Sequence, residues 1–386
     1  EMLPIDPSTD VPPEFKESQR GKPNGFVGET DVFDTWFTSS LSPQIVSKWL
    51  DEDDEMDNIF PMDIRPQSHE IIRTWAFYTI VKSFIHHNSI PWRNVIISGW
   101  VLDPDRKKMS KSRGNTVVPT DILDQYGADS VRYWASSFRL GSDATNDEKI
   151  FRVGSKLVTK LYNAGKFVLF QDAYIGDITQ EIDKAFIHEL NLIVNKATNA
   201  FEKHEFSIAL QETENFFWGS FTDNYIELVK NRSRNGDFTE ISSAVSTLRF
   251  SLNILLRLFA PFVPTITDEI WSWAYKKETE IESIHLSDWP KGEEFNNISP
   301  PKNVESFDLA CQAISAVRKS KSELGLGMSR PIKKIDFYCD DVIWEKLILV
   351  LNDVLSASVS SDVDHHSIEK PFKNSINSKI QLFENI

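Results

Sequence analysis

The sequence has few cysteines and no long hydrophobic run. Its 386 residues include only Cys311 and Cys339, which are too few for a disulfide framework and lack the paired spacing of a zinc site. No apolar run approaches the ~20 residues that a membrane span needs, and no basic-then-apolar leader opens the sequence. We therefore expect a cytoplasmic location, no structural metal and no membrane partner.

Basic charge is also in deficit. The 42 Lys and Arg residues stand against 57 Asp and Glu residues, which gives a formal net charge of -15. A protein that coats nucleic acid through counterion release over its whole surface would carry the opposite sign. A polyanionic partner must therefore meet a local basic patch. Residues 101–170, with 12 basic and 8 acidic side chains, hold such a local excess.

The remaining composition is typical of a globular protein. Hydrophobic residues make up 40% and charged residues 26% of the chain, so a sizeable core can form. The length leaves room for two or three domains at roughly 150 residues each. Residues 1–30 are rich in Pro, Gly and charge, which is typical of a connector. We expect a fragment of a longer protein, with this connector as the tail of an upstream insertion.

The hydrophobic pattern changes along the chain. Within residues 31–147, the runs "DNIFPMDIRP", "SHEIIRTWAFYTIVKSFIHH" and "WRNVIISGWVLD" predict strand, helix and strand, and hence part of a parallel α/β sheet. Residues 148–295 carry long amphipathic stretches that predict a helical bundle. In residues 296–386, helix patterns again alternate with a strand pattern, which predicts a small α/β module. The predicted fold class is α/β followed by all-α, with a terminal α/β module.

One stretch stands out for its chemistry: "ISGWVLDPDRKKMSKSRGN", residues 97–115. A predicted strand ends at Gly99, and a loop with five cations and two hydroxyl groups follows. Ligands of open parallel sheets bind beyond the carboxyl ends of the strands, and such a loop suits a triphosphate. A solvated basic loop is the alternative interpretation.

Within this stretch, "KMSKS" followed by "GN" resembles the nucleotide-binding loop of the class I aminoacyl-tRNA synthetases. Further segments resemble the valyl-tRNA synthetase family, in particular its archaeal type. They are "DVFDTWFTSSLSP" (31–43), "RPQSHEIIRTWAFYTIV" (65–81), "YGADSVRYWAS" (126–136) and "LFAPFVPTITDEIW" (258–271). The first two distinguish the valyl family from its isoleucyl and leucyl relatives.

The resemblance implies a Rossmann-type catalytic domain that ligates valine to its tRNA. ATP, with Mg²⁺, would activate valine to valyl-adenylate, and the valyl group would pass to the terminal ribose of tRNA. Lys108 and Lys111 would be the catalytic cations on the phosphates. The ATP-binding set implied by the family is Gly99, Trp100, Lys108, Met109, Ser110, Lys111 and Ser112.

The same resemblance implies an amino-acid pocket. Trp36 and Trp75 match the tryptophans that wall the valine side chain, and Glu70 falls where an acidic residue would hold the ammonium group. Two positions depart from the family: Asp is more usual at Glu70, and His is usual at Trp100. For Trp75, core packing is the alternative interpretation.

The helical bundle would correspond to the family's anticodon-binding domain. Its candidate tRNA contacts are Arg152, Lys156 and Lys160 on one helical face, and Lys230, Arg232 and Arg234 at a helix end. For each of these residues, an ordinary exposed helix face is the alternative interpretation. We expect a monomer whose partners are tRNA, ATP and valine.

The family has a second nucleotide-binding signature, His-x-Gly-His. None of the eight histidines of the sequence stands in this pattern. The resemblance then implies a C-terminal portion that lacks the first half of the catalytic domain and the editing domain. We expect the isolated chain to be inactive as a ligase and still able to bind tRNA. Two alternatives are an isoleucyl-type class I synthetase and an RNA-binding protein without catalysis.

Overall fold

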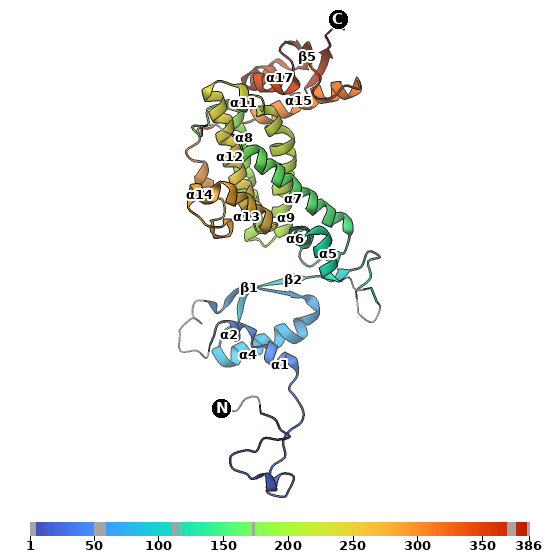
Figure 1. Cartoon of the computed structure of the whole chain (residues 1–386), viewed down its shortest axis with the longest axis vertical. Coiled ribbons are helices and arrows are strands. Elements are labelled where there is room, and N and C mark those ends of the chain that lie inside the picture. The colour runs from blue at the N-terminus through green and yellow to red at the C-terminus, as the bar shows by residue number, and fades with distance from the viewer. Residues whose placement is uncertain are drawn as a thin grey trace. The chain divides into compact units, whose positions relative to one another are not determined.

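The computed structural model describes residues 5–49, 59–109, 114–115, 118–171, 174–368 and 376–383. The sequence "DEDDEMD" at residues 51–57, which we interpret as a solvated acidic loop, lies outside the described residues. The chain divides into two compact units, Glu1–Gly99 and Trp100–Ile386 (Figure 1). This division falls at the end of the strand before the cationic loop. The predicted domain bounds after residues 30, 147 and 295 stay predictions.

Unit 1 contains the predicted strand–helix–strand unit. Strands β1 (Met62–Ser68) and β2 (Trp92–Ser98) pair in parallel, with Met62 opposite Trp92 and Ser68 opposite Ser98. The connection between them runs through η2 (His69–Ile71), the π-helix η3 (Ile72–Ala76) and α4 (Phe77–His87). Helix α4 ends where Asn88 adopts a left-handed conformation with φ of 51°. The prediction of a parallel α/β arrangement is confirmed.

Short elements precede this sheet. They are η1 (Glu17–Gln19), α1 (Thr35–Ser39) and α2 (Ser42–Val46). The Asp34 side chain caps α1 by accepting a hydrogen bond of 2.8 Å from the backbone N–H of Trp36. Capping fixes where α1 begins, and it therefore sets the position of Trp36 in the first turn of that helix.

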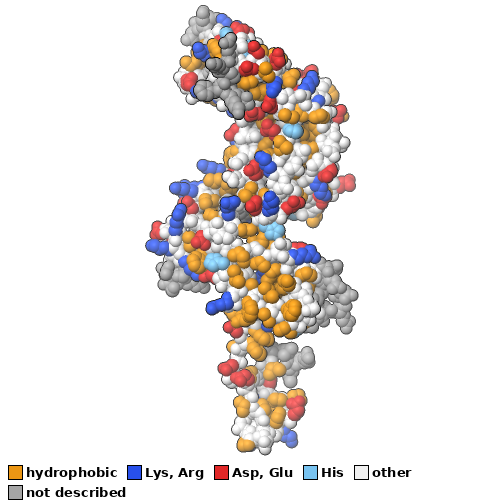
Figure 2. Space-filling model, turned by 180° about the vertical axis from the view of Figure 1, so that it is seen from behind, with side chains coloured by type: hydrophobic (Ala, Val, Ile, Leu, Met, Phe, Trp, Pro, Cys, Tyr) orange, Lys and Arg blue, Asp and Glu red, His pale blue; other side chains and the backbone are white. Residues whose placement is uncertain are grey.

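Helix α4 leaves much of its apolar surface in solvent. Phe77, Phe84 and Ile85 are exposed, and the exposed fraction of Ile85 reaches 72%. Figure 2 shows apolar side chains gathered over this unit. A contiguous apolar surface of this kind is unusual for a monomeric protein and marks a surface that favours association.

Unit 2 begins with a short parallel pair, β3 (Val101–Leu102) and β4 (Ala144–Thr145). A helical bundle follows, as predicted. Its helical elements are α5 (Pro119–Tyr126), α6 (Ala128–Ser136), α7 (Glu148–Leu169), α8 (Glu181–Glu202), α9 (Phe206–Asn215), the π-helix η5 (Phe216–Tyr225), α10 (Ile226–Val229), α11 (Arg232–Asn235), α12 (Phe238–Phe259), α13 (Pro264–Trp273) and α14 (Tyr275–Thr279).

The bundle core forms around α12, which packs against both α7 and α8. Leu161, Phe186 and Leu252 are completely buried there. Helix α12 begins with a capping box, in which Asp237 accepts from the Glu240 N–H and Glu240 accepts from the Asp237 N–H. These side chains belong to one hydrophobic core that also includes buried residues of the terminal module, such as Phe337.

The terminal module follows the 3-10 turns η6 (Ile284–Leu286) and η7 (Gly292–Phe295). Its elements are α15 (Ser306–Glu323), β5 (Lys334–Cys339), α16 (Asp341–Leu347), η8 (Ile348–Val350), α17 (Leu351–Ser358), β6 (Val363–Ser367) and β7 (Asn377–Gln381). The sheet order is β6-β5-β7, with β5 parallel to β6 and antiparallel to β7. Helix α15 contacts both α8 of the bundle and β7 of the module. Across the described ranges, no helix has the length and apolar character needed to span a membrane.

Candidate functional site

The elements that carry the two predicted pocket tryptophans meet in unit 1. The indole Nε1 of Trp75, in η3, donates a hydrogen bond of 2.8 Å to the backbone carbonyl of Ser39, the last residue of α1. Trp36 lies in the same five-residue helix, and both tryptophans are half-buried. The hydrogen bond ties α1 to the connection after β1, so the two predicted walls belong to one local arrangement.

Arg65 packs against Trp75 from β1. Its guanidinium carbon lies 3.1 Å from the Trp75 ring centroid and 4.7 Å from that of Trp92. The side chain is 7% exposed, and its Nε and Nη2 atoms have no hydrogen-bond partner among the described residues. Burial lowers the pKa of Arg65 to about 10. The guanidinium therefore makes cation–π contacts with both rings, which stabilise the packing of Trp75.

Sequence reasoning missed Arg65. The only signal available was its position in β1, where Arg65 and Gln67 alternate with exposed residues and therefore point to the buried face.

Glu70 lies in η2, directly after the carboxyl end of β1, and its side chain is exposed. Its neighbour His69 joins this turn to the next strand, since the imidazole Nδ1 lies 3.3 Å from the carbonyl oxygen of Ser98 at the end of β2. The carboxyl ends of parallel strands are where open α/β sheets bind ligands. Glu70 is therefore at the expected edge of the sheet.

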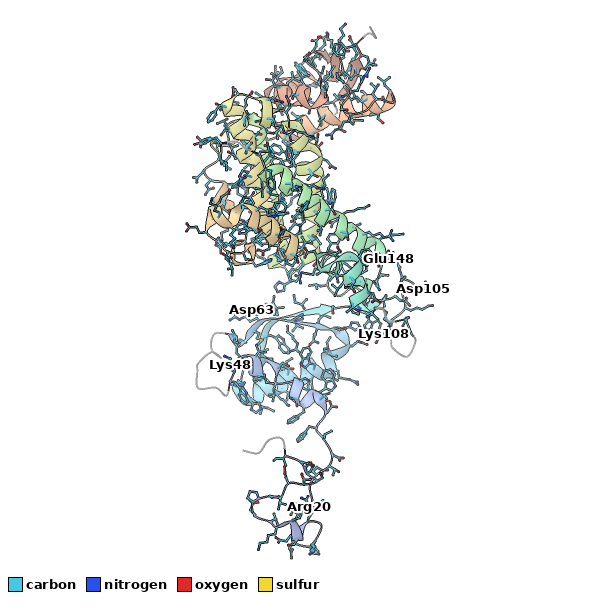
Figure 3. All side chains as sticks on the ribbon, viewed as in Figure 1. Arg20, Lys48, Asp63, Asp105, Lys108 and Glu148 are labelled. Atoms are coloured by element: carbon cyan, nitrogen blue, oxygen red, sulfur yellow. The ribbon has the colours of Figure 1, made fainter. Side chains whose placement is uncertain are left out.

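The start of the cationic loop is described through Met109. Leu102 and Lys108 form an antiparallel bridge, and the ammonium group of Lys108 lies 4.6 Å from the Trp100 ring centroid. Lys108 is exposed on the loop that also carries Asp105 (Figure 3). Gly99 joins β2 to Trp100. The predicted site residues Ser110, Lys111 and Ser112 lie outside the described residues.

Asp103 closes the base of this loop. Its Oδ1 accepts a hydrogen bond of 2.8 Å from the Lys107 N–H, and its Oδ2 accepts one of 2.9 Å from Asn115 Nδ2. Asn115 Nδ2 also donates to the Lys108 carbonyl at 3.3 Å. The hydrogen bonds from Lys107 and Asn115 hold the pKa of Asp103 below its usual range. One buried carboxylate thus joins the residues before and after the signature, a role that sequence reasoning did not assign.

Comparisons with known proteins concern the family of the chain. Residues 8–149 match the family of class I tRNA synthetases (I, L, M and V). Residues 183–336 match the anticodon-binding domain of tRNA ligase. The chain belongs to the class I aminoacyl-tRNA synthetases.

Among relatives of this synthetase chain, the valine–tRNA ligase of Thermobifida fusca is 44% identical over 339 residues, which cover 86% of the chain and 38% of the relative. That of Salinispora tropica is 40% identical over 392 residues, covering 96% of the chain and 45% of the relative. The chain thus spans less than half the length of these curated relatives. The archaeal type stays a prediction.

The fold of this synthetase chain also resembles a solved structure. The ternary complex of Agrobacterium radiobacter K84 LeuRS with tRNA and LeuAMS superposes with a TM-score of 0.58 at 20% sequence identity. The match covers 72% of this chain and 35% of that chain. At this identity the likeness concerns the fold alone, and it agrees with a class I catalytic region followed by a helical domain.

The three cations on α7 that were predicted to contact tRNA differ in whether they have an acidic partner. Arg152 pairs with Glu148 at 2.9 Å, and Lys160 pairs with Asp223 at 3.2 Å. Lys156 is exposed. Surface pairs such as that of Arg152 are weak, so they do not prevent these cations from meeting a phosphate.

Among the three cations near α11, Arg232 is unsuited to binding RNA. Only 8% of the residue is exposed, and its guanidinium pairs with Asp183 at 2.6 Å and Asp353 at 2.7 Å. Its donors are used to join α8, α11 and α17, so the expectation of an RNA contact at Arg232 is not supported. Lys230 and Arg234 are exposed, and Lys230 pairs with Glu227 at 3.3 Å.

Sequence reasoning also missed a group of exposed aromatic side chains at the same end of the bundle. Phe170, Tyr174 and Phe238 are 72%, 65% and 70% exposed, and Tyr174 stacks on Phe238 with a centroid distance of 5.5 Å. A cavity of about 450 Å³ beside Phe170 is lined by Lys166 and Arg234. Exposed rings next to cations suit the stacking of unpaired bases. Their signal in the sequence was aromatic residues at helix ends or just beyond them.

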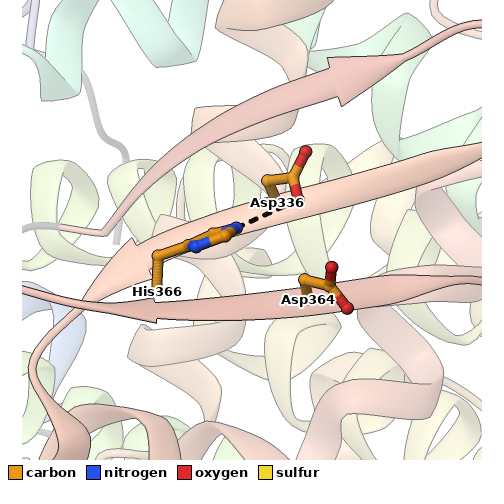
Figure 4. A group of neighbouring side chains, drawn as sticks. All are labelled: Asp336, Asp364 and His366. Carbon is orange, nitrogen blue, oxygen red and sulfur yellow. Dashed lines mark hydrogen bonds and ion pairs between the residues drawn. The ribbon is translucent and has the colours of Figure 1, made fainter.

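The terminal module contains a cluster of two carboxylates and one imidazole (Figure 4). The ligand atoms of Asp336, Asp364 and His366 lie within 4.8 Å of one another. His366 Nε2 donates to Asp336 at 3.1 Å, and Lys334 pairs with Asp364 at 2.6 Å. Protein groups therefore already compensate both carboxylates, and the cluster needs no cation.

Proposed function

We propose that this chain carries part of an ATP-dependent valine–tRNA ligase. Valine would attack the α-phosphate of ATP to form valyl-adenylate and release pyrophosphate, and the valyl group would then pass to the terminal ribose of its tRNA. The observation that carries the proposal is the 2.8 Å hydrogen bond from Trp75 to Ser39, which joins the elements of the two predicted pocket tryptophans in a chain of this family.

The proposed amino-acid site uses side chains of unit 1. Trp36 and Trp75 would wall the valine side chain, and the Glu70 carboxylate would hold the ammonium group. A rigid aromatic slot excludes larger side chains by shape, because a fixed ring cannot move aside for an extra methylene. Arg65 supports this proposal, since its guanidinium carbon lies 3.1 Å from the Trp75 ring centroid and packs against that ring.

The proposed nucleotide site uses the cationic loop. Lys108 and Lys111 would stabilise the charge that develops on departing pyrophosphate, while Gly99, Trp100, Met109, Ser110 and Ser112 would shape the surrounding surface. Both Asp103 oxygens accept hydrogen bonds from the loop itself. When bound together with ATP, Mg²⁺ would neutralise part of the charge on the phosphates.

The proposed tRNA surface lies on the bundle. Arg152, Lys156, Lys160, Lys230 and Arg234 would meet phosphates, and the exposed rings of Phe170, Tyr174 and Phe238 would stack on unpaired bases. Arg232 is left out because its guanidinium is already paired with two buried carboxylates. Each stacked base contributes about 1–3 kcal/mol, so Phe170→Ala should weaken tRNA binding about tenfold without unfolding the chain.

The test of the ligase proposal is a chimera, in which this chain replaces the matching region of the Thermobifida fusca relative. Amino-acid-dependent exchange of pyrophosphate into ATP is then measured. Exchange stimulated by valine supports the proposal. Stimulation by isoleucine would favour the isoleucyl alternative. Exchange absent from a folded chimera that still binds tRNA would favour an RNA-binding protein without catalysis.

A further inference from the structure

A cavity of about 570 Å³ lies between α6 and α9 of unit 2, two helices that contact each other. Its lining includes Tyr133 on α6 and Arg139 just beyond that helix, together with Ile208, Leu210 and Glu214 on α9. Small-molecule sites in proteins have volumes in this range. We call this space the α6–α9 cavity. None of these five residues belongs to the amino-acid, nucleotide or tRNA surfaces proposed above.

The carboxylate of Glu214 is oriented by two uncharged donors. The Tyr133 hydroxyl donates to Oε2 at 2.8 Å, and the Trp218 indole donates from Nε1 to Oε1 at 3.2 Å. The nearby ion pairs use Glu212 and Asp223, and Glu214 has no cationic partner among the described residues. Burial raises the pKa of Glu214, because the ionised form loses contact with water. A cationic group in the cavity would offset this cost.

Arg139 brings the opposite charge to the same cavity. Its side chain is exposed, and within the described ranges neither an ion pair nor a side-chain hydrogen bond engages its guanidinium. Glu214 and Arg139 therefore line one cavity without pairing with each other. A ligand with a cationic end and an anionic end complements both groups, because an ammonium group pairs with a carboxylate and a guanidinium binds a carboxylate through two parallel hydrogen bonds.

The apolar lining narrows the class of ligand further. Leu210 is 2% exposed and belongs to the hydrophobic core, and Ile208 packs against this core. Both side chains line the cavity, so they offer an apolar surface to a ligand. An α-amino acid with an aliphatic side chain carries an ammonium group, a carboxylate and an apolar group. It therefore matches all three kinds of lining.

Ligands with charge of one sign fit this lining less well. A phosphate group would meet the carboxylate of Glu214, and two anions at close range repel each other. A diamine would pair with Glu214 but would bring a second cation into a cavity that already holds Arg139. The lining therefore favours a zwitterion over a polyanion such as RNA and over a polyamine.

We propose that the α6–α9 cavity binds a free aliphatic α-amino acid, with the ammonium group on Glu214 and the carboxylate on Arg139. This site is distinct from the proposed valine pocket, because Trp36, Glu70 and Trp75 lie in unit 1 and the cavity lies in unit 2. No residue of the proposed ligase sites takes part in it, so the two sites can be tested separately.

The test is isothermal titration calorimetry of the full chain with leucine, because the proposed valine pocket should exclude this larger side chain. Two analogues of leucine each lack one charged group: leucinol has no carboxylate, and isocaproate has no ammonium group. We expect leucine to bind and each analogue to bind about tenfold more weakly, since each loses one charge-assisted interaction.

Two variants assign the two ends of the ligand. Arg139→Gln should weaken leucine binding about tenfold and leave leucinol binding unchanged, because leucinol has no carboxylate for Arg139 to hold. Glu214→Gln should weaken leucine binding about tenfold and leave isocaproate binding unchanged. The matched control is Glu212→Gln, two residues away on α9, where the carboxylate pairs with Lys196. It should change the affinity for leucine by less than about twofold.

Arg139 is exposed, so Arg139→Gln should keep the melting temperature of the chain and decides the proposal even if Glu214→Gln unfolds it. Failure of leucine to bind, leucinol binding as tight as that of leucine, or an equal loss in the control would overturn the proposal. So would leucine binding that is lost in Glu70→Gln and kept in Arg139→Gln, because the ligand would then lie in unit 1. Valine-dependent pyrophosphate exchange by the chimera decides the ligase proposal separately.

Discussion

The indole of Trp75 donates its N–H to the carbonyl oxygen of Ser39 at 2.8 Å, and this contact joins η3 to α1. Trp75→Phe keeps an aromatic ring on Arg65 but leaves the Ser39 carbonyl without this donor. Such a loss costs about 1 kcal/mol. We expect the KM for valine in pyrophosphate exchange by the chimera to rise about fivefold, with little change in kcat. Trp134→Phe, which removes an indole donor to Thr145 in unit 2, is the matched control. Equal effects of the two substitutions on the valine KM would contradict the assignment of Trp75 to the pocket.

The carboxylate of Asp103 accepts hydrogen bonds from both sides of the cationic loop. Its charge and geometry should therefore affect the binding of ATP by this loop. Asp103→Asn replaces one acceptor by a donor and turns one of the two hydrogen bonds, from Lys107 or Asn115, into a repulsive contact. We expect valine-dependent exchange by the chimera to fall about tenfold in kcat/KM for ATP, while the KM for valine stays unchanged. Asp105→Asn on the same loop is the control, because Asp105 is exposed and lies 3.9 Å from Lys107. A change in the valine KM as large as that for ATP would mean that the loop is not specifically affected.

The contrast between Arg232 and Arg234 shows where sequence reasoning stops. The runs around residues 62–68 and 92–98 predicted two parallel strands because short apolar runs on either side of a helical pattern are typical of a strand–helix–strand unit. Arg232 and Arg234 are both arginines of helix α11, so the sequence does not distinguish them. Residues two positions apart on a helix face different directions, however. Only the fold brings Asp183 and Asp353, from α8 and α17, to Arg232.

The same reason explains the missed residues. Arg65 acquires its role from Trp75, ten positions along the chain, and Asp103 acquires its role from Asn115 across the loop. The motif predicted which residues match the family, but it carried no information on which neighbours hold them. The π-helix η3 was also not predicted, since its hydrophobic pattern over five residues does not differ from that of an α-helix.

Glu189 on α8 should make the stability of unit 2 depend on pH. Burial, helped by the nearby charge of Asp308, raises the pKa of Glu189 from 4.5 to about 7. Between these values the folded chain binds more protons than the unfolded chain, so its stability falls as pH rises from 4.5 to 7. Glu189→Gln should therefore raise the free energy of unfolding by up to about 3 kcal/mol at pH 8 and change it little at pH 4. Urea unfolding at several pH values, with the exposed Glu202→Gln on the same helix as control, measures this difference. A benefit that is the same at both pH values would contradict the role of Glu189.

The exposed apolar face of α4 should favour self-association of the isolated chain. Ile85 is 72% exposed and Phe84 is exposed beside it, so replacing both with lysine removes apolar surface without opening a cavity. We expect Phe84→Lys/Ile85→Lys to keep the far-UV circular dichroism spectrum and to reduce the fraction of oligomer in sedimentation experiments. Val342→Lys, at an exposed position of the terminal module, is the control. An oligomer fraction that responds equally to both variants would argue against α4 as the associating surface.

Arg232 should be among the most sensitive positions for stability. Asp183 is fully buried and accepts hydrogen bonds from Tyr225 and Ser243 in addition to the Arg232 guanidinium. Arg232→Met removes the only cation of this network among the described residues and leaves two buried carboxylates unpaired, which costs about 3–5 kcal/mol. Arg234→Met, two residues away and exposed, should change stability by no more than about 0.5 kcal/mol.

The loss of stability caused by Arg232→Met should also depend on pH, and it should be larger at high pH. Burial already raises the pKa of Asp353 to about 6 with Arg232 in place, and removing the cation raises it further. The folded variant then takes up protons at acidic pH, so its deficit relative to the wild-type chain should be smaller at pH 5 than at pH 8. Thermal unfolding of both arginine variants at these two pH values tests the argument. A deficit of the same size at both pH values would mean that lost packing, rather than the two unpaired carboxylates, accounts for the effect of Arg232→Met.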